Sequence, residues 1–277
     1  MQKWVLDGDR LVGLENLKWS SDRAFTHGFG VFETMLVVDS RLISANLHFV
    51  RMRDGCERLG ISPPDDAELY EGIQTLLQTL DLEEGRVRVR VVRTGGRGSL
   101  NELVGVDEVT MMGAEALPPV PDSVKVVVSP WTRNEGSPLA GIKCLSYAEN
   151  LVALDDARLK GAEETILGNS RGEICEAATS NAFLVENSKL YTPHFDSGCL
   201  LGTARERVLR LARAEGIEVI EAALQMFRLD LAEEIFLTSA TRGVVPVSEI
   251  SGRALPTPGP VTGALKVAFE DSLRPRA

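Results

Sequence analysis

The chain has 277 residues, of which 44% are hydrophobic and 25% are charged. That length is enough for one large domain or for two ordinary ones, each with its own core. The formal net charge of −10 repels phosphate backbones and anionic lipids, so neither a nucleic-acid partner nor a membrane partner is expected. If such an acidic protein binds an anion, a few specific arginines or helix N-termini must supply the local positive charge.

The cysteines and histidines indicate neither disulfides nor a metal site. No CxxC pair occurs, which is typical of free thiols in a reducing compartment, and the histidines lack metal-ligand spacing. The first ten residues, MQKWVLDGDR, have no apolar core of signal-peptide length, and no apolar run elsewhere could span a bilayer. We therefore expect a cytoplasmic protein without a bound metal.

The first half of the chain predicts strands and two helices in alternation. Residues 46–59 have apolar residues at loosely helical spacing and end before Gly60, and RVRVRVV at 86–92 alternates strictly, which predicts a strand with one apolar and one charged face. The elements expected here are a hairpin of 4–6 and 11–14 around a turn at 7–9, a strand at 31–38, helices at 46–59 and 66–80, and a strand at 86–92.

The segment AEALPPVPD at 114–122 has the composition of a linker, so domains are expected at 1–113 and 123–277. Strands and helices interleave on both sides of it, which predicts two mixed α/β domains. In the second domain we expect strands at 124–129, 164–167, 181–185, 218–220 and 235–238, and helices at 146–160, 203–215 and about 262–273.

Lys143 lies in the segment LAGIKCLSYAEN, where small or apolar residues flank it and no acidic residue stands within five positions. A lysine in apolar surroundings loses part of its preference for the charged form and becomes a usable amine nucleophile. The alternative is a lysine that snorkels from the end of a strand, and the local sequence alone favours that alternative.

A second segment, GEICEAATSNAF at 172–183, places Glu173 and Glu176 beside a run of small residues. Small residues allow the backbone to approach a flat ligand closely. A buried glutamate there needs a cationic partner, and a protonated ring nitrogen would serve. The alternative is a glutamate-rich turn on the surface.

Further segments could bind an anion. Gly202 and Thr203 stand at the start of a predicted helix, whose first-turn N–H groups form an anion site. Arg51 could clamp a phosphate with two N–H groups, although an arginine in a helix is usually solvated. Glycines flank Arg97 and Arg242 in two turns, which leaves room for a carboxylate or a phosphate close to the main chain.

Taken in chain order, these segments resemble the fold-type IV pyridoxal-phosphate enzymes, also called class IV aminotransferases. The resemblance begins at SDRAFTHGFGVFETM (21–35) and ends at TRGVVPVSEI (241–250), so it covers almost the whole chain. It is specific because five segments occur in family order with matching separations. It implies a two-domain α+β fold like that of D-amino-acid aminotransferase, pyridoxal 5′-phosphate as cofactor, a small amino substrate and a homodimer.

The resemblance also implies roles for single residues. Lys143 would form a Schiff base with the cofactor and shuttle the substrate α-proton, and Glu176 would keep the pyridine nitrogen protonated, so that the ring acts as an electron sink. Arg51 would bind the cofactor phosphate. Ala240 stands where several aminotransferases carry threonine, but its N–H can still donate. The other cofactor-binding positions implied are Ser180, Asn181, Gly202, Thr203, Ser239 and Ala240.

Within the family, three segments look most like 4-amino-4-deoxychorismate lyase, an enzyme of folate biosynthesis. They are TGGRG at 94–98, LAGIKCLSY and TRGVVPV. That enzyme expels pyruvate from its substrate and leaves 4-aminobenzoate. Arg97 would then bind a substrate carboxylate, and Phe29 and Val31 would line the pocket. Thr34 also stands where branched-chain enzymes usually have glycine.

Two alternatives remain open. The first is an aminotransferase that acts on a branched-chain or D-amino acid, which Lys143 and Glu176 would support equally well. The second is a member that binds the cofactor or an anion without turnover. Retention of both residues argues against it, because a binding module needs neither a Schiff base nor an electron sink.

Overall fold

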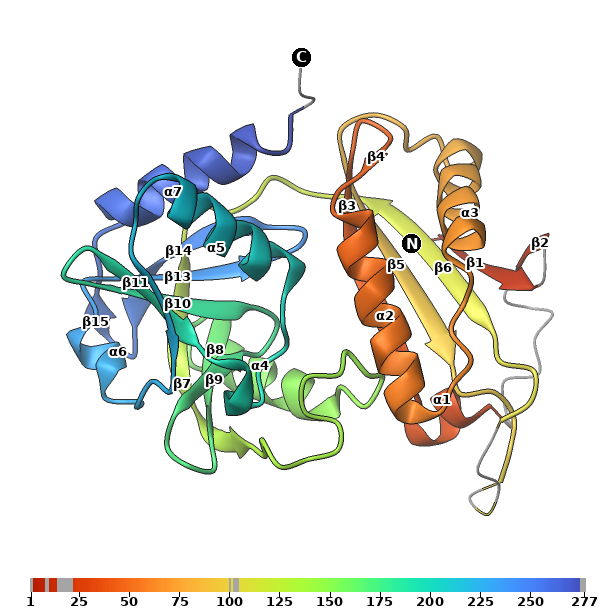
Figure 1. The fold of residues 1–277 in the computed structure, drawn as a ribbon, viewed down its shortest axis with the longest axis horizontal. Coiled ribbons are helices and arrows are strands. Elements are labelled where there is room, and N and C mark those ends of the chain that lie inside the picture. The colour runs from red at the N-terminus through yellow and green to blue at the C-terminus, as the bar shows by residue number, and fades with distance from the viewer. Residues whose placement is uncertain (1, 8–9, 14–21, 100, 102–104, 275–277) are drawn as a thin grey trace. The chain divides into compact units, whose positions relative to one another are not determined.

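The computed structural model describes residues 2–7, 10–13, 22–99, 101 and 105–274. Strands and helices alternate through them (Figure 1), which confirms the mixed α/β class. The chain divides into two compact units, Met1–Pro118 with Ile142–Tyr147, and Pro119–Gly141 with Ala148–Ala277. Lys143 is thus grouped with the first unit, which corrects its expected place in the domain 123–277. The expected linker at 114–122 begins inside a strand, and the division falls between Pro118 and Pro119.

The first unit contains a six-stranded antiparallel sheet in the order β2-β1-β6-β5-β3-β4. β1 and β2 pair as the expected hairpin, but Gly8, Asp9 and Leu14 lie outside the described residues. The strands are β1 (Gln2–Asp7), β2 (Arg10–Gly13), β3 (Gly30–Val38), β4 (Arg41–Leu42), β5 (Arg86–Thr94) and β6 (Thr110–Ala116).

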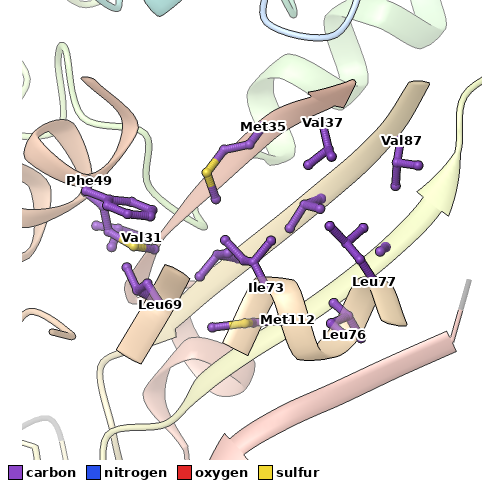
Figure 2. Packing of buried hydrophobic residues seen from close by; sticks show 14 of the residues in the cluster. Val31, Met35, Val37, Phe49, Leu69, Ile73, Leu76, Leu77, Val87 and Met112 are labelled. Atoms are coloured by element: carbon purple, nitrogen blue, oxygen red, sulfur yellow. The ribbon is translucent and has the colours of Figure 1, made fainter. Parts of the chain in front are cut away.

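Two helices, α2 (Ala45–Leu59) and α3 (Asp66–Thr79), bury their apolar faces against this sheet. Figure 2 shows Met35 of β3 and Met112 of β6 among the α3 side chains Ile73 and Leu77. Because successive strand residues face opposite sides, the valines of β5 join this core and its alternate arginines lie on the other face of the sheet.

The buried face of α2 differs from the expected one. Leu47 and Val50 are 43% and 56% exposed, whereas His48 and Phe49 are buried. Of the five apolar residues at helical spacing, which are Leu47, Val50, Met52, Cys56 and Leu59, Met52 and Cys56 are buried as the spacing indicates. The expected face is wrong at Leu47 and Val50, because the polar residue His48 occupies part of the buried face.

The second unit contains a nine-stranded mixed sheet in which β10 lies between β11 and β13, and β7 between β14 and β8. β7 is parallel to both of its neighbours, and β11 is parallel to β12. The strands are β7 (Val124–Arg133), β8 (Glu164–Asn169), β9 (Ile174–Ala177), β10 (Asn181–Glu186), β11 (Lys189–Pro193), β12 (Val219–Ala222), β13 (Glu234–Ser239), β14 (Gly243–Ile250) and β15 (Arg253–Ala254).

Three helices pack against this sheet. α5 (Thr203–Ala214) and α7 (Pro260–Asp271) pack against β13, and α4 (Ala148–Leu159) packs against β7 and β8. Phe183 of β10 and Phe236 of β13 stack with ring centres 4.8 Å apart. Among the described residues, none of the helices is both long and apolar enough to cross a bilayer.

Candidate functional site

The residues singled out from the sequence fall into both units. The first unit holds the lysine, the helix arginine and the three expected pocket residues, which are Lys143, Arg51, Phe29, Val31 and Arg97. The second holds the glutamate and the expected phosphate-binding positions, which are Glu176, Ser180, Asn181, Gly202, Thr203, Ser239 and Ala240.

Lys143 is anchored through its backbone to the first half of β3. The Phe32 N–H donates to the Lys143 carbonyl oxygen at 2.9 Å, and the Leu145 N–H donates to the Gly30 carbonyl oxygen at 2.9 Å. The Lys143 Nζ lies 4.4 Å from the ring centre of Phe32 and 5.7 Å from that of Tyr147. The amine therefore lies beside two aromatic rings, which themselves form an edge-to-face pair.

Arg90 of β5 is a functional candidate that the sequence reasoning missed. Its guanidinium carbon lies 4.0 Å from the centre of the same Phe32 ring that contacts Lys143. Burial lowers the pKa of Arg90. Among the residues that the structure describes, no side-chain or backbone group accepts a hydrogen bond from its guanidinium, and no carboxylate forms an ion pair with it. A half-buried cation in this position is chemically suited to an anionic ligand.

Arg51 belongs to a buried polar group that also contains Glu33 and His48. Arg51 Nε donates to Glu33 Oε1 and its Nη2 donates to Oε2, each at 2.7 Å. The His48 Nδ1 also lies 2.7 Å from Glu33 Oε2 and must carry the proton, because a carboxylate only accepts. This bidentate pair fixes the plane of the Arg51 guanidinium.

The three expected pocket residues have different surroundings. Val31 is 1% exposed and packs in the core of the first unit, whereas Phe32, the next residue, lies beside Lys143. Arg97 pairs with Asp107, and both side chains are at least half exposed. Phe29 packs against Gly95 so closely that a Cβ at Gly95 would clash with its ring.

In the second unit, Glu176 and Asn181 both hold the same peptide segment. The Leu200 N–H donates to Glu176 Oε2 at 3.0 Å, and Asn181 Nδ2 donates to the Leu200 carbonyl oxygen at 2.7 Å. Arg133 Nη2 lies 3.9 Å from Glu176 Oε1. Glu176, the third residue of β9, is therefore a buried carboxylate with a cation nearby.

The start of α5 follows this segment and fits an anion. Gly202 is the N-cap, so no cap side chain competes for the first-turn N–H groups, and Thr203 is the first helical residue. A Cβ at Gly202 would clash with Asn181 Oδ1. Opposite Asn181 in the sheet, Thr238 carries a buried hydroxyl that has no hydrogen-bond partner among the described residues. These groups fit a phosphorylated cofactor.

Ser239 and Ala240 lie in the turn between β13 and β14, both partly exposed. The Ser239 Oγ accepts from the backbone N–H and from the Nε of Arg242, each at 3.3 Å. Arg242 Nη2 donates to Ser180 Oγ at 2.7 Å. The structure thus brings the Ser239–Ala240 turn and Ser180 together through Arg242.

Comparisons with known proteins agree with this arrangement. The model of the family "Amino-transferase class IV" matches residues 30–250. A candidate branched-chain-amino-acid aminotransferase from Methanocaldococcus jannaschii is 31% identical over 258 residues, which are 90% of this chain and 89% of that protein. Branched-chain amino acid aminotransferase from Escherichia coli has a similar structure, with a TM-score of 0.87, 25% identity, and coverage of 98% and 93% of the two chains.

A candidate 4-amino-4-deoxychorismate lyase from Legionella pneumophila has a TM-score of 0.85 at 24% identity, over 91% of this chain and 94% of that one, a likeness of fold alone. Fold, site and comparisons together define a pyridoxal-phosphate-dependent enzyme. The chain belongs to the class IV aminotransferase family, as its sequence indicated, and its cofactor is pyridoxal 5′-phosphate.

Proposed function

We propose that the enzyme is an aminotransferase that acts on an aliphatic, branched-chain amino acid. The observation that carries the proposal is the similarity to the M. jannaschii relative, which extends over nine-tenths of both chains. The aromatic environment of Lys143 supports it, because Phe32 and Tyr147 offer apolar contact beside the reactive amine.

In this proposal Lys143 would hold the cofactor covalently, and its Nζ, once released by the amine of the substrate, would take the α-proton from the substrate and return it. The cofactor supplies the electron sink that makes this proton acidic. Glu176 keeps the ring nitrogen protonated through a charge-assisted hydrogen bond. Six residues bind the phosphate, which are Arg51, Ser180, Gly202, Thr203, Ser239 and Ala240, and Asn181 orders the surroundings.

We assign the substrate carboxylate to Arg90 in place of Arg97. Arg90 is half-buried beside the ring that contacts Lys143, whereas Arg97 is an exposed residue in an ion pair with Asp107. A buried guanidinium gains more from a carboxylate than an exposed one does, because solvent screening is weaker there.

The test is a single-turnover experiment with purified holoenzyme and L-leucine, L-valine, D-alanine and aminodeoxychorismate in parallel. Loss of the cofactor's visible band with L-leucine or L-valine, without 4-aminobenzoate, supports the proposal. Lys143→Ala should show no covalent visible band, and Lys160→Ala, which changes an exposed lysine on the surface of the second unit, serves as the matched control.

The lyase of the folate route is the second candidate, and the sequences of the 94–98 loop and of the segment around Lys143 favour it. Rapid release of pyruvate and 4-aminobenzoate from aminodeoxychorismate, with L-leucine leaving the visible band unchanged, would replace the aminotransferase proposal. A homodimer is part of either proposal, and light scattering on the holoenzyme tests it.

A further inference from the structure

Glu164 is a buried carboxylate for which neither the reaction nor the cofactor accounts. It opens β8, its side chain is 1% exposed, and a charge in that position needs partners that replace water. The partners lie on two different turns of the second unit. Arg242 Nη2 donates to Glu164 Oε1 at 3.0 Å, and the Thr179 hydroxyl donates to the same oxygen.

Arg242 connects these two turns through one guanidinium. Its Nη2 lies 3.0 Å from Thr179 Oγ1 and 2.7 Å from Ser180 Oγ, and its Nε donates to Ser239 Oγ at 3.3 Å. The Thr179–Ser180 turn joins β9 to β10, just after Glu176 and just before Asn181. The planar guanidinium donates from two nitrogens in fixed directions, Nη2 toward one turn and Nε toward the other, whereas a lysine donates from a single nitrogen.

We propose that Glu164 and Arg242 are positioning residues, which lock the Thr179–Ser180 turn to the Ser239–Ala240 turn so that both present their donors to the cofactor phosphate. Glu164 neutralises and orients Arg242, and Arg242 sets the spacing between the turns. Neither residue needs to contact the ligand. The proposal rests on the proposed phosphate-binding roles of Ser180, Ser239 and Ala240, and it does not depend on which amino acid is the substrate.

The first measurement is the affinity of the apoenzyme for pyridoxal 5′-phosphate, titrated by absorbance, in Arg242→Met and Arg242→Lys. We expect the Kd to rise at least tenfold in both variants, because the lysine retains the charge but loses the fork. Arg228→Met is the matched control. Arg228 makes a comparable bidentate pair with Glu186 in the same unit, at the far end of β10 from Asn181.

The second measurement separates positioning from a general loss of folding. At saturating cofactor, Arg242→Met should raise the KM for the amino substrate while kcat stays within about threefold, because Lys143 and Glu176 are intact. A variant that only loses folded protein lowers kcat and leaves KM unchanged. Thr179→Val removes one hydroxyl and no charge, and it should raise the cofactor Kd in the same direction.

Glu164→Gln tests whether the two residues act together. If they do, the double variant Glu164→Gln/Arg242→Met binds the cofactor no more weakly than Arg242→Met alone. Equal cofactor affinity in Arg242→Met, Thr179→Val and Arg228→Met would overturn the proposal. Because this titration needs no substrate, its result stands even if the enzyme does not transaminate branched-chain amino acids.

Discussion

Glu33 and Arg51 form a bidentate ion pair in which the carboxylate is 1% exposed and the guanidinium 14% exposed. The pair joins β3 to α2 within the first unit, and His48 donates to the same carboxylate. It links the stability of the unit to the orientation of the arginine that we propose for phosphate binding.

Glu33→Gln should therefore lower both stability and cofactor affinity. Removing one partner of a buried ion pair leaves the other charge without compensation and costs about 3 kcal/mol. Urea unfolding should report that loss, and the Kd for pyridoxal 5′-phosphate should rise about tenfold, which corresponds to about 1.4 kcal/mol. Asp66→Asn, which breaks the exposed pair of Asp66 with Arg53 between α2 and α3, should change neither. Equal effects of the two substitutions would contradict this reasoning.

The same group predicts the direction of acid sensitivity. Burial alone would raise the pKa of Glu33, but the charge of Arg51 and the hydrogen bonds outweigh it and lower the pKa from 4.5 to about 2. The folded form therefore gains about 3 kcal/mol that is fully present above pH 4.5 and is lost as the pH falls toward 2.

Burial lowers the pKa of His48 below 6.5. As the pH falls, His48 therefore takes up a proton in the unfolded chain before it does so in the folded one. The free energy of unfolding thus falls as the pH drops below about 6.5. The free energy of unfolding, measured from pH 8 to pH 3, should decline in both windows. The decline below pH 4.5 should shrink in Glu33→Gln, and the decline between pH 6.5 and 5 should shrink in His48→Gln. Unchanged slopes in both variants would show that other groups control acid unfolding.

Arg90→Gln should raise the KM for the amino substrate at least tenfold, because it removes a charge-assisted contact to a carboxylate. Arg97→Gln is the control, since its guanidinium is exposed and paired with Asp107. Steady-state kinetics at saturating cofactor provide the measurement. A larger effect at Arg97 would restore the assignment that the sequence suggested.

Gly202→Ala should weaken cofactor binding about tenfold, because the added Cβ clashes with Asn181 Oδ1 and must displace either that amide or the start of α5. Gly263→Ala in α7 is the matched control, where the Cβ meets only ordinary contacts and alanine should stabilise the helix by about 0.5–1 kcal/mol. Competition by inorganic phosphate for the cofactor site measures the anion-binding component separately. Normal binding in Gly202→Ala would mean that this helix start does not contact the phosphate.

The sequence predicted the elements whose burial is periodic. β3, β5, α2, α3 and α5 were expected within two residues of their observed bounds, because apolar residues or stop signals mark them clearly. Six strands were missed, which are β4, β6, β9, β11, β14 and β15. Every residue of β9 and the first five of β14 are buried, so neither shows the polar alternation that distinguishes a strand.

Lys143 and Glu176 could be proposed from the sequence because they stand in distinctive segments, but the residues that surround the proposed site could not. The pairing of Glu33 could have been predicted. Glu33 alternates with Val31 and Met35 along β3 and therefore points to the same buried side, where a carboxylate needs a partner. The partner of Glu164 had no such signal. Arg242 is 78 residues away, and only the folded sheet brings the two together.

The grouping of Ile142–Tyr147 with the first unit has a consequence for synthesis of the protein on the ribosome. The segment that pairs with the edge of β3 is translated only after β7, the first strand of the second unit. The first unit therefore cannot complete its pairing before part of the second unit exists as nascent chain. For the same reason, a single cut near Pro118 cannot yield two whole units, because a fragment that ends there lacks the segment that pairs with β3 and carries Lys143.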